Sequence, residues 1–190
     1  MTARPPMAIE ATSAHVLVAE LIARARAAQA IAARYTQEQL DEVATAAAWA
    51  IMEPSRNRAL AELAVKDTGL GNVPDKILKN HRKTLGLMRD LQGAKTMGVI
   101  SENSATGITE IARPVGVVAA VVPSTNPGAT PANNIINALK CGNAVILSPS
   151  PKGCSTSAKL LEYIHAELKR IGAPLDLVQM LPSPVTKDSS

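Results

Sequence analysis

The sequence predicts an α/β protein in which a helical N-terminal layer is followed by an incomplete doubly wound, Rossmann-like parallel sheet. Apolar residues recur at helical spacing up to residue 94, whereas apolar runs rich in β-branched residues alternate with helical segments after residue 113. Polar residues and prolines stand directly after the first two of these runs. Because open α/β sheets bind ligands at the carboxyl ends of their strands, a functional site is expected at these polar positions.

Residues 1–94 are expected to form four helices. The first has one apolar stripe, formed by Val18, Leu21, Ile22 and Ala25. Thr36 with Gln39 predicts a capping box that begins the second helix, and Pro54 separates the second helix from the third. The third helix ends at Thr68–Gly71, and the fourth runs from Pro74. Its inward side is expected to carry His81 as a packing residue together with Ile77, Leu78, Leu85 and Met88.

Residues 95–112 are expected to form an antiparallel hairpin between the helical layer and the sheet. Met97–Ile100 and Ile108–Ala112 are short apolar segments on either side of the polar turn Ser101–Thr106.

The first two strands of the sheet are expected on either side of one helix. Val115–Val122 is a nearly unbroken apolar run, which is typical of a parallel strand buried on both faces. Asn126–Pro127 and Thr130–Pro131 both resemble an N-cap followed by a first-turn proline, and Gly142 ends the helix that they begin. Asn143–Leu147 is the second strand, and a crossover that contains a helix makes the two strands parallel.

A further helix and strand follow. Leu160, Ile164 and Leu168 lie at helical spacing, Gly172 and Pro174 end that helix, and Leu175–Leu181 is expected to be the third strand. The resulting β-α-β-α-β order is the first half of a doubly wound sheet. Since residues 182–190 are polar and contain proline, we expect no fourth strand, and the open sheet edge then favours association.

Composition narrows the possible functions. The 190-residue chain carries a net charge of +4, from 20 basic and 16 acidic residues spread along its length, and it has one tryptophan and two tyrosines. This combination argues against nucleic-acid binding, which uses basic patches with aromatic side chains for stacking. No apolar run reaches membrane-spanning length and the N-terminus lacks the apolar region of a signal peptide, so no membrane partner and a cytoplasmic location are expected.

The two cysteines and three histidines are not expected to act chemically. Cys141 ends a helix beside Gly142, and Cys154 begins the next helix; their spacing matches no metal site or CxxC motif, and both thiols are expected to be reduced. His15, His81 and His165 form no pair with metal-ligand spacing, so neither catalysis nor metal binding is assigned to them.

Two segments at the strand ends are the candidate sites, and each has a structural alternative. Asn126 is either a helix N-cap or a side-chain amide donor in a reaction site. Ser148–Lys152 is either a proline-stiffened loop or a nucleotide contact, in which hydroxyls, a lysine and the amides at the start of the helix after Gly153 hold a ribose or a phosphate. The sequence contains no G-x-G-x-x-G motif.

The segment Arg-Pro-Val-Gly-Val-Val-Ala-Ala-Val-Val-Pro-Ser-Thr-Asn-Pro, followed by Leu-Lys-Cys-Gly-Asn-Ala-Val-Ile-Leu-Ser-Pro-Ser-Pro, resembles the NAD(P)-dependent aldehyde dehydrogenase superfamily. Two segments are similar to its CoA-acylating branch, Pro123–Pro127 and Ser148–Pro151. Non-acylating members usually carry Pro-Trp-Asn-Phe-Pro at the position of the first segment and a lysine and a glutamate at the position of the second. The resemblance covers most of the chain but not the catalytic half of the family.

The resemblance implies an aldehyde dehydrogenase-like fold and a role for each candidate segment. Asn126 would donate to the oxyanion that forms when a thiolate adds to an aldehyde, with Thr125 as the alternative because an ungapped alignment places the family asparagine there. Contacts to NAD or NADP, or to CoA as co-substrate, would come from Val122, Pro123, Ser124, Thr125, Ser148, Pro149, Ser150 and Lys152.

The expected protein is thus the N-terminal, cofactor-binding portion of an enzyme that oxidises a small aldehyde to an acyl-CoA through a cysteine thioester formed outside this chain. Residues 1–94 would be the helical part of the cofactor-binding domain, 95–112 a bridging or oligomerisation hairpin, and 113–190 the first half of the NAD(P)-binding sheet. The complete enzyme is expected to be a homo-oligomer, and the 190-residue chain alone to be inactive. The alternative is a catalytically inactive truncated domain that binds a nucleotide or assembles with partner chains.

Overall fold

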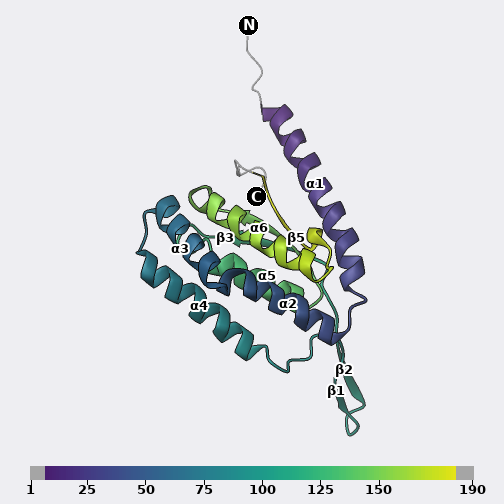
Figure 1. The fold of residues 1–190 in the computed structure, drawn as a ribbon. Helices are drawn as coiled ribbons and strands as arrows, with labels where there is room; N and C mark the ends of the chain where they lie inside the picture. The colour runs from purple at the N-terminus through teal and green to yellow at the C-terminus, as the bar shows by residue number, and fades with distance from the viewer. Residues whose placement is uncertain (1–6, 183–190) are drawn as a thin grey trace.

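The computed structural model describes residues 7–182, with side chains from residue 14 onward. The N-terminal layer contains α1 (Met7–Ala32), α2 (Gln37–Met52), α3 (Pro54–Thr68) and α4 (Val73–Asp90), and the later part contains α5 (Ala129–Lys140) and α6 (Cys154–Arg170). The strands are β1 (Gly98–Asn103), β2 (Ile108–Ala112), β3 (Val117–Val122), β4 (Ala144–Pro149) and β5 (Val178–Met180). Figure 1 shows the helices gathered around the three later strands, with β1 and β2 apart from them.

The predicted β-α-β-α-β unit is confirmed. β3, β4 and β5 form one sheet in the order β3-β4-β5, and both strand pairs are parallel. The third strand is shorter than predicted because Leu175–Leu177 forms a 3₁₀ turn and only Val178–Met180 pairs with β4. The protein therefore has the α/β fold with a parallel sheet that the sequence predicts.

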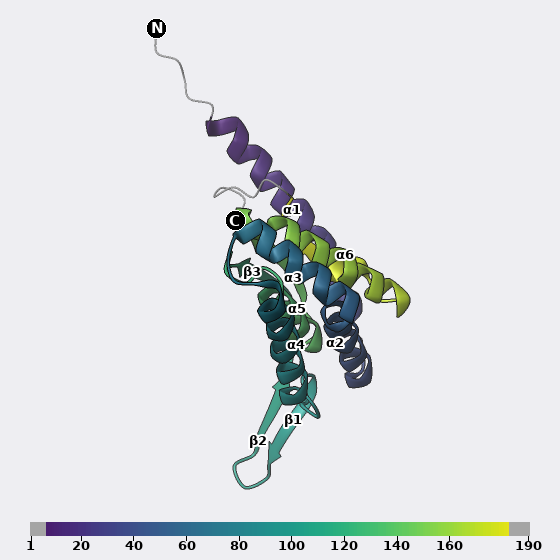
Figure 2. The same ribbon diagram turned by 60° about the vertical axis from the view of Figure 1, so that its left-hand side comes forward.

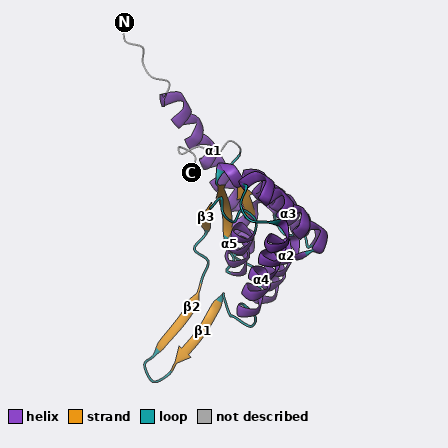
Figure 3. Cartoon of the chain, turned by 90° about the vertical axis from the view of Figure 1, so that its left-hand side faces the viewer, coloured by secondary structure: helices purple, strands orange, loops and turns teal. Residues whose placement is uncertain are grey.

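The sheet is covered on its two faces by different helices. α5 and α6 lie between the sheet and an outer layer that contains α2, α3 and α4, and α1 packs against the strands themselves (Figures 1 and 3). The buried core runs through these layers and includes Ile51, Leu60, Ile135, Leu147 and Ile164, none of which has measurable exposure. The central strand β4 is buried along nearly its whole length, which places the residues after it at a rigid edge.

β3 differs from the prediction of a strand buried on both faces. It is an edge strand of the described sheet, and the side chains of Ala119 and Val121 are exposed, Val121 by 76%. The reason is that α1 covers β4 more fully than β3, and no described strand pairs with the other edge of β3. Only the alternate residues Ala120 and Val122 are buried, against the side that carries α5.

The predicted helix boundaries in the N-terminal layer are confirmed. Thr36 and Gln39 form both hydrogen bonds of a capping box, and Pro54 is the first residue of α3. α3 ends where Gly69 adopts a left-handed conformation with φ of 66°, which a glycine reaches without steric cost.

The prediction for the inward side of α4 is only partly correct: Ile77 and Met88 are half-buried, and Met88 packs against the core. Leu78 and Leu85 are 54% and 50% exposed, and His81 is also exposed, while the buried residues of this helix are Lys76, Asn80 and Thr84. Polar side chains occupy the inward positions because two of them hydrogen-bond to other buried segments, as described below.

The predicted hairpin is also confirmed. β1 and β2 pair antiparallel from Gly98↔Ala112 to Asn103↔Ile108, with an irregularity between Val99 and Ser101. The hairpin extends away from the helices and the sheet (Figures 2 and 3), so that almost all of its side chains are exposed.

Candidate functional site

The two candidate segments lie side by side at the carboxyl edge of the sheet. The parallel register pairs Val121 with Ser148 and Val122 with Pro149, so β3 and β4 end together. The amide of Ser150 then donates to the carbonyl of Val122 at 2.9 Å, which ties the loop after β4 to the end of β3. The structure thus places residues 122–126 and 148–152 in one region.

The loop between β3 and α5 carries Asn126, and this residue is not a helix cap. α5 begins at Ala129, its N-cap position is Gly128, and no side chain caps it, so the predicted N-cap roles of Asn126 and Thr130 are wrong. The helix begins between the two predicted positions, with Pro131 in its first turn, and the Asn126 carbonyl accepts from the Thr130 amide at 3.4 Å. Within residues 14–182 the side-chain amide of half-buried Asn126 forms no hydrogen bond, while Thr125 is exposed.

The same loop is held against the start of α6. A Cβ atom on Gly153 would lie 2.5 Å from the Cβ of Pro127, so only a glycine allows the two segments to approach this closely. The hydroxyl of Ser157 donates to the carbonyl of Pro127 at 3.1 Å inside the protein. These contacts fix the loop from the side of α6.

A lysine from α4 holds the loop from the other side. The ammonium Nζ of Lys76 donates to the carbonyl of Thr125 at 3.0 Å, and Lys76 is only 5% exposed. No sequence pattern marks Lys76 as a functional residue. Its contact joins positions 49 apart in the chain, and a lysine in a helix ordinarily lies at the surface.

The end of β4 and the residues directly after it carry two hydroxyls and one cation. Ser148 and Ser150 are half-buried, Pro149 is buried and Lys152 is exposed. Ser148 lies on the side of the sheet that α1 covers, where it helps to line a cavity of about 800 Å³ whose other walls include Val18, Ile22 and Ile146. The hydroxyls and the ammonium of this segment have the chemistry that a ribose or a phosphate requires.

The start of α6 does not offer the anion site that the sequence predicts. The carboxylate of Asp67 at the end of α3 accepts from the Thr156 amide at 3.0 Å, and it also accepts from the hydroxyls of Ser155 and Thr156. A protein carboxylate therefore already stabilises this helix N-terminus, and a phosphate there would meet a like charge. Asp67 was missed because it acts across 89 residues of sequence.

Neither cysteine is placed to react in this site, and of the histidines, which all lie in the described part of the chain, only His15 lies near it, on the wall of the cavity that Ser148 also lines. Burial raises the pKa of the Cys141 thiol, and the Cys154 side chain is buried at 8% exposure. The Nε2 of His165 lies 2.8 Å from the carbonyl oxygen of Val178, and His15 and His81 are exposed. Across the described part of the chain no group of three potential metal ligands occurs.

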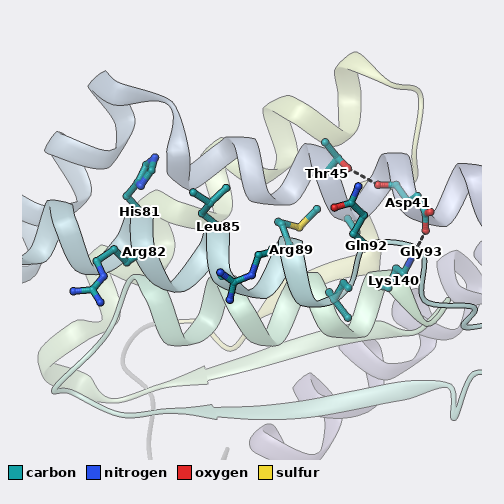
Figure 4. Close-up of a pocket in the computed structure, with 13 residues that line it drawn as sticks. Asp41, Thr45, His81, Arg82, Leu85, Arg89, Gln92, Gly93 and Lys140 are labelled. Atoms are coloured by element: carbon teal, nitrogen blue, oxygen red, sulfur yellow. Dashed lines mark hydrogen bonds and ion pairs between the residues drawn. The ribbon is translucent and has the colours of Figure 1, made fainter.

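A second cavity of about 830 Å³ lies elsewhere, between α2 and α4 (Figure 4). His81, Arg82 and Arg89 line it from α4, and at one end Lys140 forms an ion pair with Asp41. Lys140 is the last residue of α5, at the opposite end of that helix from the loop that carries Asn126. This cleft is therefore separate from the edge of the sheet where the candidate residues gather.

Comparison with known proteins identifies the family to which the chain belongs. The family model described as "Aldehyde dehydrogenase family" matches residues 6–188, and the chain belongs to this family. Among curated relatives, the sulfoacetaldehyde dehydrogenase (acylating) of Cupriavidus necator is 67% identical over 95% of the chain, and that of Bilophila wadsworthia is 44% identical over 88%. The chain spans 36% of the length of each of these two relatives.

Solved structures agree on the fold. An acetylating aldehyde dehydrogenase from Geobacillus thermoglucosidasius superposes with a TM-score of 0.87 and is 33% identical; the match covers 96% of this chain and 40% of that one. A propionaldehyde dehydrogenase from Rhodopseudomonas palustris with bound CoA and an acylated cysteine gives a TM-score of 0.76 at 26% identity, with 90% of this chain and 38% of that one covered. The relatives named here are thus acylating members of the family, as the resemblance of the two segments implies.

Proposed function

We propose that this chain is the N-terminal, cofactor-binding portion of an NAD(P)-dependent, CoA-acylating aldehyde dehydrogenase, and that its aldehyde is sulfoacetaldehyde. The observation that carries the proposal is the 67% identity to a sulfoacetaldehyde dehydrogenase (acylating) across 95% of the chain. The juxtaposition of residues 122–126 and 148–152 at one edge of the sheet supports it, because that edge is where an open α/β sheet binds ligands.

Asn126 is the proposed oxyanion donor. Its side-chain amide forms no hydrogen bond to another described residue, and the backbone on either side of it is fixed by Lys76 and Ser157. A side-chain amide carried by a fixed loop can stabilise negative charge on a former carbonyl oxygen. Thr125 is the alternative donor at this position, and its side chain is exposed.

The end of β4 and the residues directly after it fit the adenosine end of a nucleotide. Ser148 and Ser150 offer hydroxyls, and exposed Lys152 offers a cation for a phosphate. When bound, NAD(P) supplies the hydride acceptor and CoA supplies the thiol that takes the acyl group. An engineered glycolyl-CoA reductase with bound NADP+ superposes on this chain with a TM-score of 0.76 at 26% identity, which supports the same cofactor class here.

We further propose that the β1–β2 hairpin takes part in assembly of the complete protein as a homo-oligomer. Four large apolar side chains of this projecting hairpin are 43–58% exposed: Val99, Ile100, Ile108 and Ile111. Large apolar side chains exposed on a projecting element are typical of interaction surfaces. Replacing Ile108 and Ile111 by serine should lower the mass measured by light scattering, whereas an unchanged mass would contradict this role.

The proposed reaction is tested on the complete protein that contains this sequence. Reduction of NAD+ or NADP+ is followed with sulfoacetaldehyde, acetaldehyde and succinate semialdehyde, each with and without CoA. The expected result is CoA-dependent turnover with the highest kcat/KM for sulfoacetaldehyde. Turnover without CoA, or a preference for another aldehyde, would contradict the acylating activity or the substrate, respectively.

A further inference from the structure

Lys76 is a buried cation with no carboxylate partner among residues 14–182. Its Nζ donates to the carbonyl of Thr125 at 3.0 Å, and the side chain leaves only 5% of the residue exposed. Burying an ammonium group away from a counter-ion is costly, so an arrangement of this kind calls for an explanation beyond packing. Burial lowers the pKa of Lys76, and the nearby charge of Lys79 lowers it further.

The turn before α4 passes beside this side chain. Gly71 adopts φ of 74°, and a Cβ there would lie in ordinary van der Waals contact, 3.5 Å from the Cε of Lys76. The segment from Asp67 to Asn80 therefore serves both candidate loops, because Asp67 caps α6 and Lys76 binds the loop before α5. Asn80 lies beside the same loop near Gly128, and its side-chain amide donates to the side-chain oxygen of Asn57 at 3.0 Å.

The position of the hydrogen bond matters more than its energy. The carbonyl that Lys76 binds belongs to the peptide that links Thr125 to Asn126, so this contact fixes the orientation of the peptide on which the Asn126 side chain depends. Pro127, on the other side of Asn126, is held by Gly153 and Ser157. Without Lys76 the loop would be fixed on one side of Asn126 only.

We propose that Lys76 is a positioning residue for the reaction site, which holds the Thr125–Asn126 peptide so that the Asn126 amide points at the developing oxyanion. This inference rests on the proposed function. If Lys76 served only to stabilise the fold, Lys76→Met would lower stability. Replacing a buried charged group by an apolar side chain is, however, often neutral or stabilising. Lys76→Met should therefore leave stability unchanged or higher while catalysis falls.

The first test uses the 190-residue chain and needs no activity. NMR compares three proteins: the wild type, Lys76→Met, and the control Lys79→Met, which removes an exposed lysine of the same helix. Two quantities are measured, the chemical shift of the Thr125 carbonyl carbon and the hydrogen exchange of the Asn126 backbone amide. We expect the Thr125 signal to move and the Asn126 backbone amide to exchange faster only in Lys76→Met. Identical loop signals in all three proteins would overturn the proposal, and so would a Lys76→Met chain that fails to fold.

The second test is a double-mutant cycle in the complete protein. Lys76→Met should lower kcat by about 100-fold, the effect expected when a reacting group is displaced by about 1 Å, with the KM for NAD(P) and for CoA unchanged. In an Asn126→Ala background the same change should have little further effect, because the two residues act as one unit. Lys76→Arg, which retains a donor, should recover most of the lost kcat.

The outcomes separate this inference from the proposed function. Equal losses of kcat from Lys76→Met with and without Asn126 would show that Lys76 does not act through Asn126, and no loss at all would also overturn the proposal. If the complete wild-type protein oxidises no aldehyde, the proposed function fails, and the NMR comparison alone then decides whether Lys76 holds the loop.

Discussion

Asn126 is the residue on which the proposed chemistry depends most directly. Since Gly128 is the N-cap of α5 and the Asn126 amide caps nothing, a substitution there should cost little stability. Asn126→Ala in the complete protein should lower kcat by about 100-fold, corresponding to roughly 3 kcal/mol of transition-state stabilisation. Both kcat and the melting temperature are measured.

The contrasting outcome is equally specific. A lost helix cap costs about 1 kcal/mol of stability and leaves turnover intact. If the melting temperature of Asn126→Ala falls while kcat is unchanged, Asn126 has a structural role and Thr125 becomes the candidate donor.

Gly153 sets the distance between the two candidate segments. Gly153→Ala would place a Cβ 2.5 Å from the Cβ of Pro127, so the loops must separate, and overpacking of this kind costs about 1–3 kcal/mol. Gly86→Ala, within α4, is the matched control. Nothing lies within 4 Å of its Cβ position, so alanine there should raise the free energy of unfolding by about 1 kcal/mol. Urea denaturation should show that Gly153→Ala lowers the free energy of unfolding and that Gly86→Ala raises it. A stabilised Gly153→Ala would contradict the close approach of Gly153 to Pro127.

At the scale of the elements, α6 depends on two acidic residues that act across the sequence. Asp67 stabilises its start, and near its end the carboxylate of Glu167 pairs with Arg56 of α3 at 2.7 Å and with Arg170 at 2.9 Å. Burial of Glu167 favours its neutral form, but the hydrogen bonds from Arg170 and Arg56 outweigh that effect and hold its pKa below the usual 4.5.

The pH dependence of this contact has a definite sign. A carboxyl group whose pKa is lowered on folding contributes stability above its unfolded pKa and loses that contribution as the pH falls through its folded pKa. The free energy of unfolding should therefore fall below about pH 4.5, and Glu167→Gln should be less stable by about 2 kcal/mol at pH 7 with a shallower loss in acid.

The control for this experiment is Glu62→Gln, which changes an exposed residue of α3 and should alter stability at pH 7 by less than about 0.5 kcal/mol. An acid dependence that is the same in Glu167→Gln and in the wild type would show that Glu167 is not the group responsible.

Sequence patterns over a few residues predicted the helices and strands well. Polar contacts between residues far apart in the sequence explain most of what these patterns missed. The capping box at Thr36, the end of α3 at Gly69 and the parallel strands all follow from rules that act over a few residues. The inward side of α4 was predicted only in part, because Lys76 is buried by a contact with a loop 49 positions away, which no helical periodicity can indicate. For the same reason Asp67 was missed.

At the scale of the whole molecule, sheet and helices form one layered body and the hairpin projects from it (Figures 1 and 2). In the part of the chain that the structure describes, no helix combines the length and the apolar character that crossing a bilayer requires. The strand order β3-β4-β5 leaves one edge of β3 without a strand partner among the described residues, with Ala119 and Val121 exposed. Further strands of a doubly wound sheet would pair with this edge.

The 190-residue chain alone should show no aldehyde-dependent reduction of NAD(P)+. Neither cysteine is placed as a nucleophile, because Cys154 is buried and burial raises the pKa of Cys141, which disfavours the reactive thiolate. A spectrophotometric assay with CoA and several aldehydes, on protein of verified mass, checks this. Turnover that disappears in Cys141→Ser or Cys154→Ser would contradict it.

If the carboxyl edge of β3 and β4 binds the adenosine end of a nucleotide, titration of the labelled 190-residue chain with AMP, NAD+ or CoA should reveal it by NMR. We expect weak, saturable shifts confined to residues 122–125 and 148–152, because the proposed site here lacks the contacts that the complete enzyme would add. These shifts should be lost when Ser148 and Lys152 are both replaced by alanine. A folded chain that shows no shifts at millimolar ligand, or shifts only in the cleft between α2 and α4, would contradict binding at this edge.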